Sequence, residues 1–412
     1  MSVPLVRPFA AIRPAPGKAA VVVAPPYDVL TTEEARARAA GNPASFLHVS
    51  KPEIDLPVGA DAMSDDAYAT AARNMQRMLA EGVLVRDAAP GFYVYRLTRE
   101  GHVQTGVAAA ASMAAYENGR VRRHELTRPD KEHDRARQID AVNAHTGPVF
   151  ATHRADDRVA AGIAAATAGP PAMQAEVDGT SHEVWTVDDP AAVTEMAAAF
   201  EAMPAIYIAD GHHRSAAAAR VAEWRRAAGA GAGDGHEWFL VVSFPADEVA
   251  ILDYNRVVRD LNGLDPAVFL DAITDAFYVA PATEPVRPDA PGVFGLFVDG
   301  GWHRLQVRTP PPADVPPVAR LDITVLTERL LAPVLAIGDP RTDPRIDFVG
   351  GGRGLGELER RVRSGDWAVA FSLYPTSLAD LMAVADAGQV MPPKSTWFEP
   401  KLADGLLSLP ID

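Results

Sequence analysis

Two periodicities of hydrophobic and polar positions divide the chain into predicted strands and helices. Short apolar runs, which are typical of buried strands, occupy residues 92–97, 184–188, 205–209, 238–244, 293–298, 302–307 and 367–373. Apolar residues spaced three or four apart, which are typical of amphipathic helices, occupy residues 65–81, 191–202, 266–277, 323–336 and 377–387. Strands and helices are intermixed, so the sequence predicts an α+β fold of mixed sheets with helices.

Several shorter segments complete this prediction. Residues 21–30 are expected to form a strand that ends at two prolines, and residues 46–50 are expected to form a second short strand. Two pairs of segments are predicted to form hairpins, namely 92–97 with 104–115 and 238–244 with 249–258. The glycines of residues 229–235 lack the GK[ST] ending of a phosphate loop and predict a surface loop.

The length of the chain predicts more than one domain. A chain of 412 residues, 48% of them hydrophobic, has material for several cores. We expect an N-terminal α+β domain at residues 1–155, a core around the sequence DGHHR at residues 156–260, and a C-terminal α+β domain with a returning arm at residues 261–412.

The composition narrows the possible functions. The absence of cysteine excludes disulfides, cysteine-ligated metals and thiol nucleophiles. A net charge of -15 argues against general nucleic-acid binding, whereas a small anion in a local basic pocket stays compatible. The sequence shows neither a long apolar run nor a signal-peptide pattern, so we expect a cytoplasmic protein without a membrane partner. It does not indicate an oligomeric state.

The densest group of chemically active side chains follows the predicted strand at 205–209. It consists of Asp210, Gly211, His212, His213, Arg214 and Ser215, and an alanine-rich helix comes directly after it. Glycine lets the backbone approach a ligand, and the first N–H groups of a helix attract anions. Arg214 can bind a phosphate with two parallel hydrogen bonds. The segment predicts a phosphate cradle beside the Asp210 carboxylate; the alternative is a solvated turn with Asp210 as a cap.

Three other polar residues are candidates for catalysis. Asp28 follows two prolines, and it can be a catalytic residue, a metal ligand or an ordinary turn residue. His124 and Glu125 adjoin at the end of a predicted strand, where they can act as acid and base or share a metal. The HExxH zinc pattern is absent, because Arg128 stands four positions after His124.

A further candidate site lies in the C-terminal arm. Lys394, Ser395 and Thr396 follow two prolines that hold the backbone extended. A lysine with hydroxyl neighbours can close a phosphate site as a point charge. We therefore expect the arm to fold back onto the DGHHR turn, so that Lys394 faces the pocket of Arg214. The alternative is a structural arm wrapped over the core.

Five motifs occur in a fixed order along the chain. They are PPYDV at 25–29, HELT at 124–127, IADGHHR at 208–214, YNRVV at 254–258 and MPPKSTWFEPKL at 391–402. Taken together they resemble the bacterial and archaeal DUF1015 family of uncharacterised proteins, and the resemblance runs nearly end to end. It names no reaction.

Residues 193–220 carry a second, more local resemblance. They are similar to the nucleotide-binding core shared by ParB-type CTPases, sulfiredoxins and the archaeal free-serine kinase, in which the turn after the strand binds nucleotide phosphates. The resemblance implies that the side chains of His212, His213, Arg214 and Ser215 hold phosphates and that Asp210 holds Mg²⁺. The position of the kinase's catalytic glutamate stays open between Glu125, Glu176 and Glu183. The sulfiredoxin reaction is excluded, because the chain has no cysteine.

The leading hypothesis is a nucleotide-dependent phosphotransferase that acts on a small hydroxylated metabolite such as serine, with ATP, ADP or CTP as its nucleotide and Mg²⁺ as its metal. Phosphoryl transfer needs charge neutralisation and positioning more than covalent chemistry, and Asp, His, Arg and Lys side chains supply both. A nucleotide-binding regulatory protein without turnover is the second hypothesis. A phosphatase or other hydrolase that uses Asp28 or Glu125 is the third.

Overall fold

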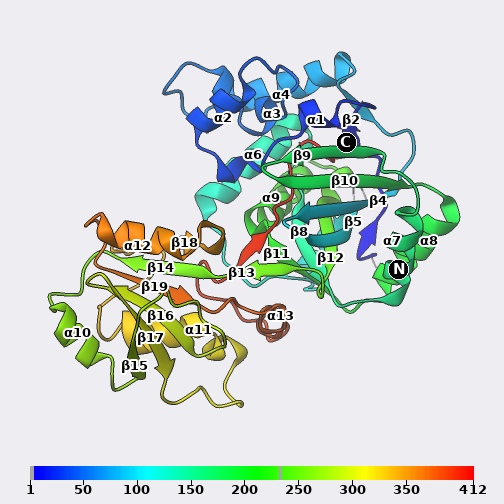
Figure 1. The fold of residues 1–412 in the computed structure, drawn as a ribbon. Coiled ribbons are helices and arrows are strands. Elements are labelled where there is room, and N and C mark those ends of the chain that lie inside the picture. The colour runs from blue at the N-terminus through cyan, green and yellow to red at the C-terminus, as the bar shows by residue number, and fades with distance from the viewer. Residues whose placement is uncertain (1–3, 232–233) are drawn as a thin grey trace. The chain divides into compact units, whose positions relative to one another are not determined.

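The computed structural model describes residues 4–231 and 234–412, which fold into two compact units (Figure 1). The first unit contains the residues up to 123, residues 127–249 and residues 400–412, and the second contains residues 124–126 and 250–399. The loop predicted at 229–235 lies partly outside the described residues. None of the helices in the described residues is both long and apolar enough to cross a membrane.

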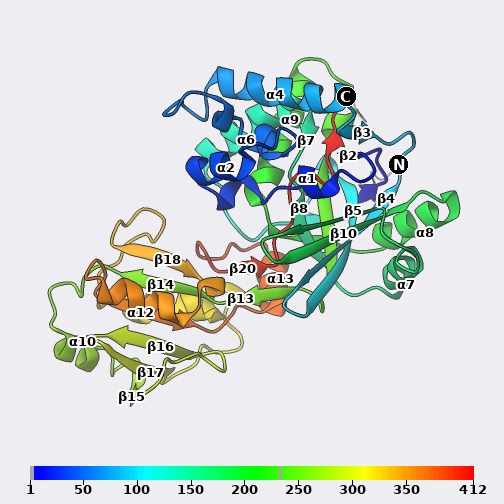
Figure 2. The ribbon, with the colours of Figure 1, turned by 45° about the horizontal axis from the view of Figure 1, so that its top comes forward.

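Among the described residues, a nine-stranded mixed sheet forms the framework of the first unit (Figures 1 and 2). Its strands are β1 (Val6–Arg7), β4 (Phe92–Arg99), β5 (His102–Ser112), β6 (Val121–Arg122), β8 (Val149–His153), β9 (Met173–Val177), β10 (Thr180–Val187), β11 (Ile206–Asp210) and β12 (Trp238–Pro245). They run in the order β6-β11-β8-β12-β5-β4-β10-β9, with β1 paired to β5. Since β12 is parallel to β8 and antiparallel to β5, the predicted α+β fold with mixed sheets is confirmed.

Helices of the first unit take part in two larger hydrophobic cores, one of which includes strands of this sheet. They are α1 (Ala19–Val22), α2 (Thr32–Ala39), α3 (Leu47–Ser50), α4 (Asp65–Ala80), α5 (Met113–Glu117), α6 (Pro129–Val142), α7 (Asp157–Ala166), α8 (Pro190–Glu201) and α9 (His212–Ala227). One core joins the sheet to α7, α8 and α9, and includes Val159, Phe200, Ile208 and Ala218. The other joins α3 and α4 and includes Phe46, Leu47 and Met75.

Two segments predicted as strands are instead helical. Residues 21–30 contain the end of α1 and a 3₁₀ turn at Tyr27–Val29, and residues 46–50 contain α3. Leu47 and Val49 are both fully buried in the core beside α4. Both strand predictions are therefore wrong. A short apolar run shows no periodicity by which a buried helical turn could be distinguished from a strand.

The hairpin predicted from residues 238–258 is also wrong. β12 pairs with β5 on one side and with β8 on the other, so neither edge is left for the next strand. β14 (Tyr254–Val258) pairs in the sheet of the second unit instead. The division expected near residue 155 falls inside the first unit, because β8 and β12, which lie on either side of it in sequence, are paired.

The described part of the second unit contains a six-stranded sheet in the order β15-β17-β16-β19-β14-β18. Its other strands are β15 (Phe277–Ala282), β16 (Val293–Val298), β17 (Gly301–Val307), β18 (Ile346–Gly350) and β19 (Val369–Leu373), and its helices are α10 (Pro266–Ala272), α11 (Asp322–Leu326), α12 (Leu355–Arg363) and α13 (Leu378–Asp386). Phe297, Trp302 and Leu358 belong to its core. β13 (Ala250–Leu252) pairs separately with β20 (Trp397–Glu399).

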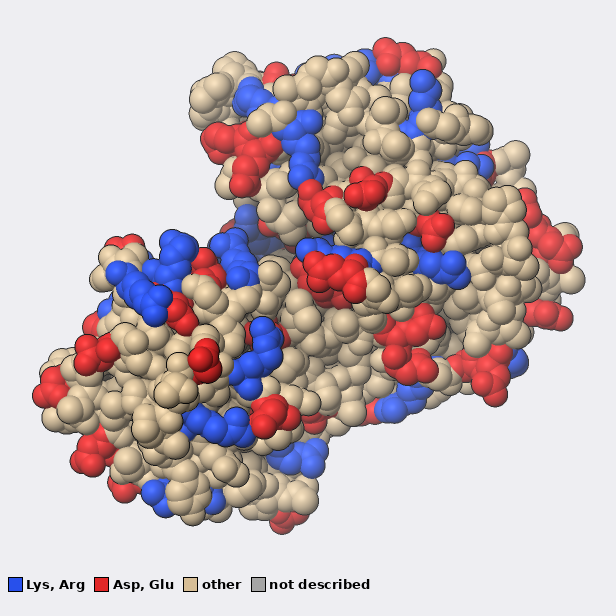
Figure 3. Space-filling view, in the orientation of Figure 1, with Lys and Arg blue, Asp and Glu red and all other residues tan. Residues whose placement is uncertain are grey.

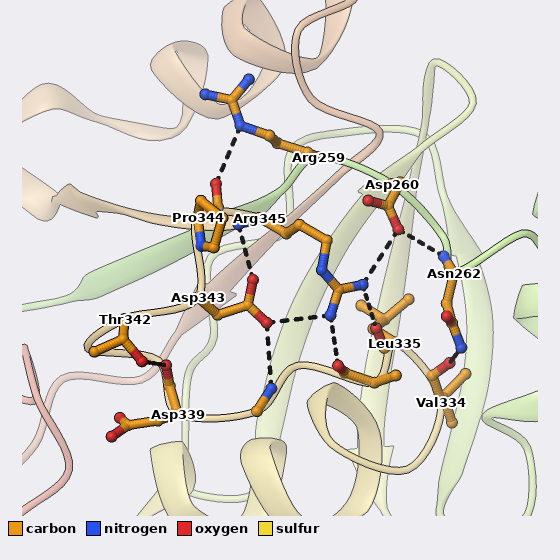
Figure 4. A network of polar contacts seen from close by, with 12 residues as sticks. Arg259, Asp260, Asn262, Val334, Leu335, Asp339, Thr342, Asp343, Pro344 and Arg345 are labelled. Atoms are coloured by element: carbon orange, nitrogen blue, oxygen red, sulfur yellow. Dashed lines mark hydrogen bonds and ion pairs between the residues drawn. The ribbon is translucent and has the colours of Figure 1, made fainter.

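Arg345 anchors the loop that leads into β18 (Figure 4). Its guanidinium donates to the carbonyl oxygen of Leu335 at 3.1 Å and to the carboxylate of Asp343 at 3.1 Å. Arg259, which directly follows β14, donates to the carbonyl oxygen of Pro344 at 3.2 Å. These side-chain hydrogen bonds act together with a backbone hydrogen bond from the N–H of Arg259 to the carbonyl oxygen of Arg345 at 2.8 Å, and they hold the loop to the end of β14.

Residues 400–412 form an arm that packs within the first unit. The backbone N–H of Asp404 donates to the carbonyl of Ala24 at 2.9 Å, and that of Ser408 donates to the carbonyl of Ile12 at 2.8 Å. Ile12 itself begins the short strand β2 (Ile12–Pro14), which pairs with β3 (Leu84–Arg86). Farther along the arm, β21 (Leu409–Pro410) pairs with β7 (Ala144–His145). The arm is therefore held by backbone hydrogen bonds along most of its length.

We expect Gly235→Ala to loosen the end of this arm. A Cβ at Gly235 would lie 2.5 Å from the carbonyl carbon of Ile411 and 2.6 Å from its Cα, and the backbone of the arm would have to move. Chemical denaturation should show a loss of about 1–3 kcal/mol in the free energy of unfolding. The control is Gly169→Ala, whose added Cβ has none of the described atoms within 4 Å. An equal loss in both variants would contradict close packing of the arm at Gly235.

Candidate functional site

The turn between β11 and α9 depends on a left-handed glycine. Gly211 has a φ of 89° and precedes the first residue of α9. Its carbonyl oxygen accepts the backbone N–H of Arg214 at 2.9 Å and that of Ser215 at 3.1 Å, which closes the first turn of the helix. A side chain at this position would be strained and would meet the Cα of Val149 at 3.4 Å. The chain therefore turns sharply at the end of β11.

The carboxylate of Asp210, at the end of β11, forms an ion pair with the C-terminal arm. One oxygen accepts a hydrogen bond from Lys401 Nζ at 2.6 Å, and the other accepts the N–H of Gly211 at 2.7 Å. Burial alone would raise the pKa of this carboxyl, but Lys401, Arg214 and the Gly211 amide together hold the pKa well below its usual range. Asp210 therefore stays ionised and fixes the position of Lys401.

The surroundings of Asp210 do not fit a directly bound Mg²⁺. Mg²⁺ requires oxygen ligands at about 2.0–2.1 Å in near-octahedral geometry. Both oxygens of Asp210 already accept hydrogen bonds, one of them from an ammonium group that would repel a cation. The assignment of Asp210 as a metal ligand stays a prediction, and this geometry does not favour it.

Arg214 places a second cation at the same turn. Its side chain is only 14% exposed, donates to the carbonyl oxygen of Pro148 at 2.8 Å and lies 3.7 Å from the carboxylate of Asp28. The guanidinium carbon also lies 5.4 Å from the centre of the Tyr27 ring. Burial lowers the pKa of Arg214, but the neighbouring carboxylates, Asp28 first among them, raise it by more. The group therefore keeps its positive charge.

The remaining side chains of the turn contact other parts of the protein. Ser215 is fully buried, and its hydroxyl donates to the carbonyl oxygen of His212 at 3.0 Å. His213 Nε2 accepts the backbone N–H of Arg128 at 3.1 Å. His212 is itself buried at the start of α9. The phosphate contacts of these three residues stay predictions.

A carboxyl group that the sequence did not single out lies beside Arg214. Asp404 is 1% exposed, and its Oδ2 accepts the backbone N–H of Tyr27 at 3.2 Å. Its Oδ1 is buried and has no hydrogen-bond partner among the described residues. Burial is the largest cause that raises the pKa of Asp404 to about 7. A Cβ placed on Gly147 would lie 3.1 Å from this Oδ1 and 3.2 Å from Arg214 Nε. The carboxyl of Asp404 and the guanidinium of Arg214 therefore both lie next to Gly147.

These groups line a cavity of about 30 Å³, which is room for roughly two water-sized groups. Its walls include Tyr27, Arg135, Gln138, His145, Thr146, Gly147, Arg214 and Asp404. Arg135, from α6, lies over the Tyr27 ring at 4.2 Å and pairs with Asp134 at 2.8 Å. The cavity therefore has a polar wall made by four separate stretches of the chain, around residues 27, 135–147, 214 and 404.

Among the residues predicted to be catalytic, Asp28 is part of this site through its contact with Arg214. His124 and Glu125 belong to the second unit, where the carbonyl oxygen of His124 accepts the N–H of Met391 at 2.8 Å. Their catalytic roles stay predictions.

Lys394, Ser395 and Thr396 also belong to the second unit. The Lys394 ammonium lies 5.9 Å from the centre of the Tyr254 ring, and the Lys394 carbonyl oxygen accepts a hydrogen bond from the buried Arg256 at 2.8 Å. The contacts of Lys394 to Thr396 with phosphate stay predictions. Within the first unit, the lysine that meets the DGHHR turn is Lys401.

Two of the glutamates considered as catalytic bases point away from this site. The Tyr95 hydroxyl contacts His182 Nδ1 at 2.9 Å and accepts the N–H of Ala403 at 3.4 Å, so His182 lies on the face of β10 that meets the arm. Successive residues of a strand point to opposite faces, which places Glu183 on the other face. Glu176 is exposed on β9, at the end of the sheet.

The sequence reasoning missed Tyr27, Arg135, Asp404 and Lys401. Tyr27 and Lys401 lie inside motifs already singled out, at 25–29 and 391–402, and these motifs were the available signal. Arg135 stands in a charged helix whose local pattern is that of a solvated face. No local pattern distinguishes Asp404 from an ordinary turn residue.

Comparison with solved structures gives several distant likenesses. A free serine kinase in complex with AMP is 12% identical, with a TM-score of 0.35, over 71% of this chain and 86% of that chain. C-terminally truncated SbnI from Staphylococcus aureus is 12% identical, with a TM-score of 0.37, over 72% and 85%. A conserved hypothetical protein from Pyrococcus furiosus is 12% identical, with a TM-score of 0.35, over 73% and 93%. Likenesses with TM-scores below 0.5 do not establish a shared activity.

The comparison with protein families is more specific. A search of curated proteins finds no match. The family model of DUF1015, described as a protein of unknown function, matches residues 6–324, which is more than half of the chain. The motifs PPYDV, HELT, IADGHHR and YNRVV all lie inside that match. The chain therefore belongs to the DUF1015 family.

Proposed function

We propose that this protein binds nucleotide phosphates at the turn between β11 and α9 and transfers a phosphoryl group to a small hydroxylated metabolite. The observation that carries the proposal is the presence of two cationic side chains, Arg214 and Lys401, beside the N-terminus of α9. Phosphoryl transfer depends mainly on the positioning of the phosphates and the neutralisation of their charge. These groups are suited to both tasks.

The electrostatics of the turn support an anion site. α9 is 16 residues long, and no side chain caps its N-terminus. The first N–H groups of such a helix carry about half a positive charge and attract anions. Arg214 offers a planar fork for two phosphate oxygens, and Lys401 offers a point charge. The side chain of Asp28 is 55% exposed, so an arriving phosphate can take its place beside Arg214.

A local cationic site suits a small ligand. The whole chain carries a net charge of -15. On the face shown in Figure 3, Lys and Arg side chains are interspersed with Asp and Glu. Arg214 and Lys401 therefore offer a phosphate two positive charges within a chain that is acidic overall.

The proposed nucleotides are ATP, ADP or CTP, and the acceptor suggested by the sequence resemblance is serine. Mg²⁺ is proposed only as a companion of the nucleotide phosphates. Because Asp210 is paired with Lys401, we assign it no role as a ligand of that metal.

We expect Arg214→Ala to weaken nucleotide binding by about 1.5–3 kcal/mol, the range for hydrogen bonds to charged groups. Arg214→Lys should lose less, because it keeps the charge but not the fork. Calorimetric titration with ATP, ADP and CTP measures both effects, and a thermal melt checks the fold. Arg158→Ala, on α7, is the matched control. Unchanged affinity for all three nucleotides in Arg214→Ala would remove the central claim.

Lys401→Met should weaken nucleotide binding by about 1.5–3 kcal/mol, because it removes a charged hydrogen-bond donor. Asp210→Asn should keep the fold and have a smaller effect, because Lys401 retains its charge. Titrations with and without Mg²⁺ compare the two variants with wild type. Tighter Mg²⁺-dependent binding in Lys401→Met would show instead that the lysine competes with a metal on Asp210.

Nucleotide consumption distinguishes this proposal from its alternatives. The protein is incubated with ATP, ADP or CTP and Mg²⁺, with and without L-serine or glycerol. We expect consumption that depends on the acceptor. Tight binding without consumption would favour a regulatory protein, and consumption independent of the acceptor would favour a hydrolase.

A further inference from the structure

The buried carboxyl of Asp404 has one oxygen that the protein leaves without a donor. Oδ2 accepts the N–H of Tyr27, whereas Oδ1 has no partner among the described residues although its side chain is 1% exposed. A buried acceptor without a donor is costly, and most such atoms in proteins are satisfied by a ligand or a water. A ligand or a water molecule, rather than a described residue of the chain, must therefore donate a hydrogen bond to this oxygen.

The space in front of this oxygen limits the size of that donor group. The cavity has a volume of about 30 Å³, which fits roughly two water-sized groups. A hydroxyl on a single methylene has this size, and a sugar or aromatic ring does not. Gly147 keeps the space open, because a Cβ there would lie 3.1 Å from Asp404 Oδ1.

The same cavity wall carries the cation proposed to hold phosphate. The position of a Cβ on Gly147 is 3.2 Å from Arg214 Nε and 3.1 Å from Asp404 Oδ1. A phosphate on Arg214 and a hydroxyl on Asp404 would therefore be neighbours. This is the juxtaposition that transfer of a phosphoryl group to a hydroxyl requires.

We propose that Asp404 accepts the proton of the acceptor hydroxyl, and that the acceptor carries this hydroxyl on an unbranched methylene group. The inference rests on the proposed function. The hydroxyl oxygen forms a bond to the phosphorus as the bond from that phosphorus to the bridging oxygen of the nucleotide breaks. The electron pair of the broken bond stays on the leaving nucleotide. The hydroxyl proton moves to Oδ1 of Asp404 and passes to solvent after the product has left.

The groups around Asp404 are compatible with this role. The titratable and charged groups that face it are Tyr27 and Asp28 from the 3₁₀ turn, Tyr95 from β4, Arg135 from α6, His145 from β7 and Arg214 from α9. Burial lowers the pKa of His145 to about 4, so His145 is neutral at pH 7. Burial raises the pKa of Asp404 to about 7, with Arg214 opposing the increase and Asp28 adding to it. A base whose pKa lies near the working pH is effective in proton transfer.

The test compares Asp404→Asn with wild type in the full chain. Asparagine keeps an oxygen for the N–H of Tyr27 but cannot accept the proton. Acceptor-dependent consumption of ATP, ADP or CTP with L-serine or glycerol should fall at least about 100-fold, the lower range for general-base catalysis. Nucleotide affinity should be unchanged or tighter, because a negative charge near Arg214 is removed. The rise of the wild-type rate with pH near 7 should be absent from the variant. Asp140→Asn, which removes an exposed carboxylate of α6, is the matched control.

A second readout does not depend on turnover. The folded-state pKa of Asp404 lies above the unfolded value of about 3.9, so its neutral form stabilises the fold. This stabilisation is fully present below about pH 4 and is lost as the pH rises through about 7. The denaturation midpoint of wild type should therefore fall relative to that of Asp404→Asn between pH 5 and pH 8. Asp140→Asn is the control for the loss of a carboxylate elsewhere on the surface.

The outcomes separate this inference from the proposed function. A wild type that turns over, with Asp404→Asn equally active at each pH, overturns the role of Asp404 and leaves the proposed function standing. Parallel pH dependence of the midpoints of wild type and Asp404→Asn overturns the claim that Asp404 holds a proton near neutrality. A wild type that binds none of the three nucleotides overturns the proposed function itself.

Discussion

The buried guanidinium of Arg214 is the charge around which the first unit is arranged. A cation with 14% exposure has lost most of its water, and protein groups must replace that hydration. The guanidinium donates a hydrogen bond to the carbonyl oxygen of Pro148, and the carboxyl groups of Asp28 and Asp404 lie nearby. These groups come from distant parts of the sequence. The need to balance one buried charge therefore explains why the 3₁₀ turn at residue 27, the start of β8 and the C-terminal arm meet at one end of β11.

Lys401 brings a second positive charge to the turn, and its ion pair with Asp210 means that neither group lacks a partner of opposite charge. An ionised carboxylate at a helix N-terminus is favourable by itself, and here it also directs a lysine toward the same region. The two cations differ in their freedom, since Arg214 is almost enclosed and the Lys401 side chain is 25% exposed. A ligand would therefore meet one rigid partner and one that can adjust.

The sequence predicts the elements that are long enough to show a clear pattern, and the groups of site residues that are contiguous in the chain. α4 follows from a sustained helical periodicity and β12 from a run of mostly apolar residues, and the group from Asp210 to Arg214 is continuous in the chain. The short segments 21–30 and 46–50 have too few positions to show a period, and their conformation is decided by tertiary packing. Lys401 lies 191 residues from Asp210. Nothing in the local sequence tells that Lys401 pairs with Asp210.

The distance along the chain between the turn and the arm has a consequence during protein synthesis. The ribosome makes β11 and the start of α9 long before Lys401, which comes 191 residues later. At about 5–20 residues per second, roughly 10–40 s separate the two. During this interval Arg214 and Asp210 lack their partners from the arm. The nascent chain thus lacks the ion pair of the turn while most of the sheet can already form, and the proposed anion site is completed only when translation has passed residue 404.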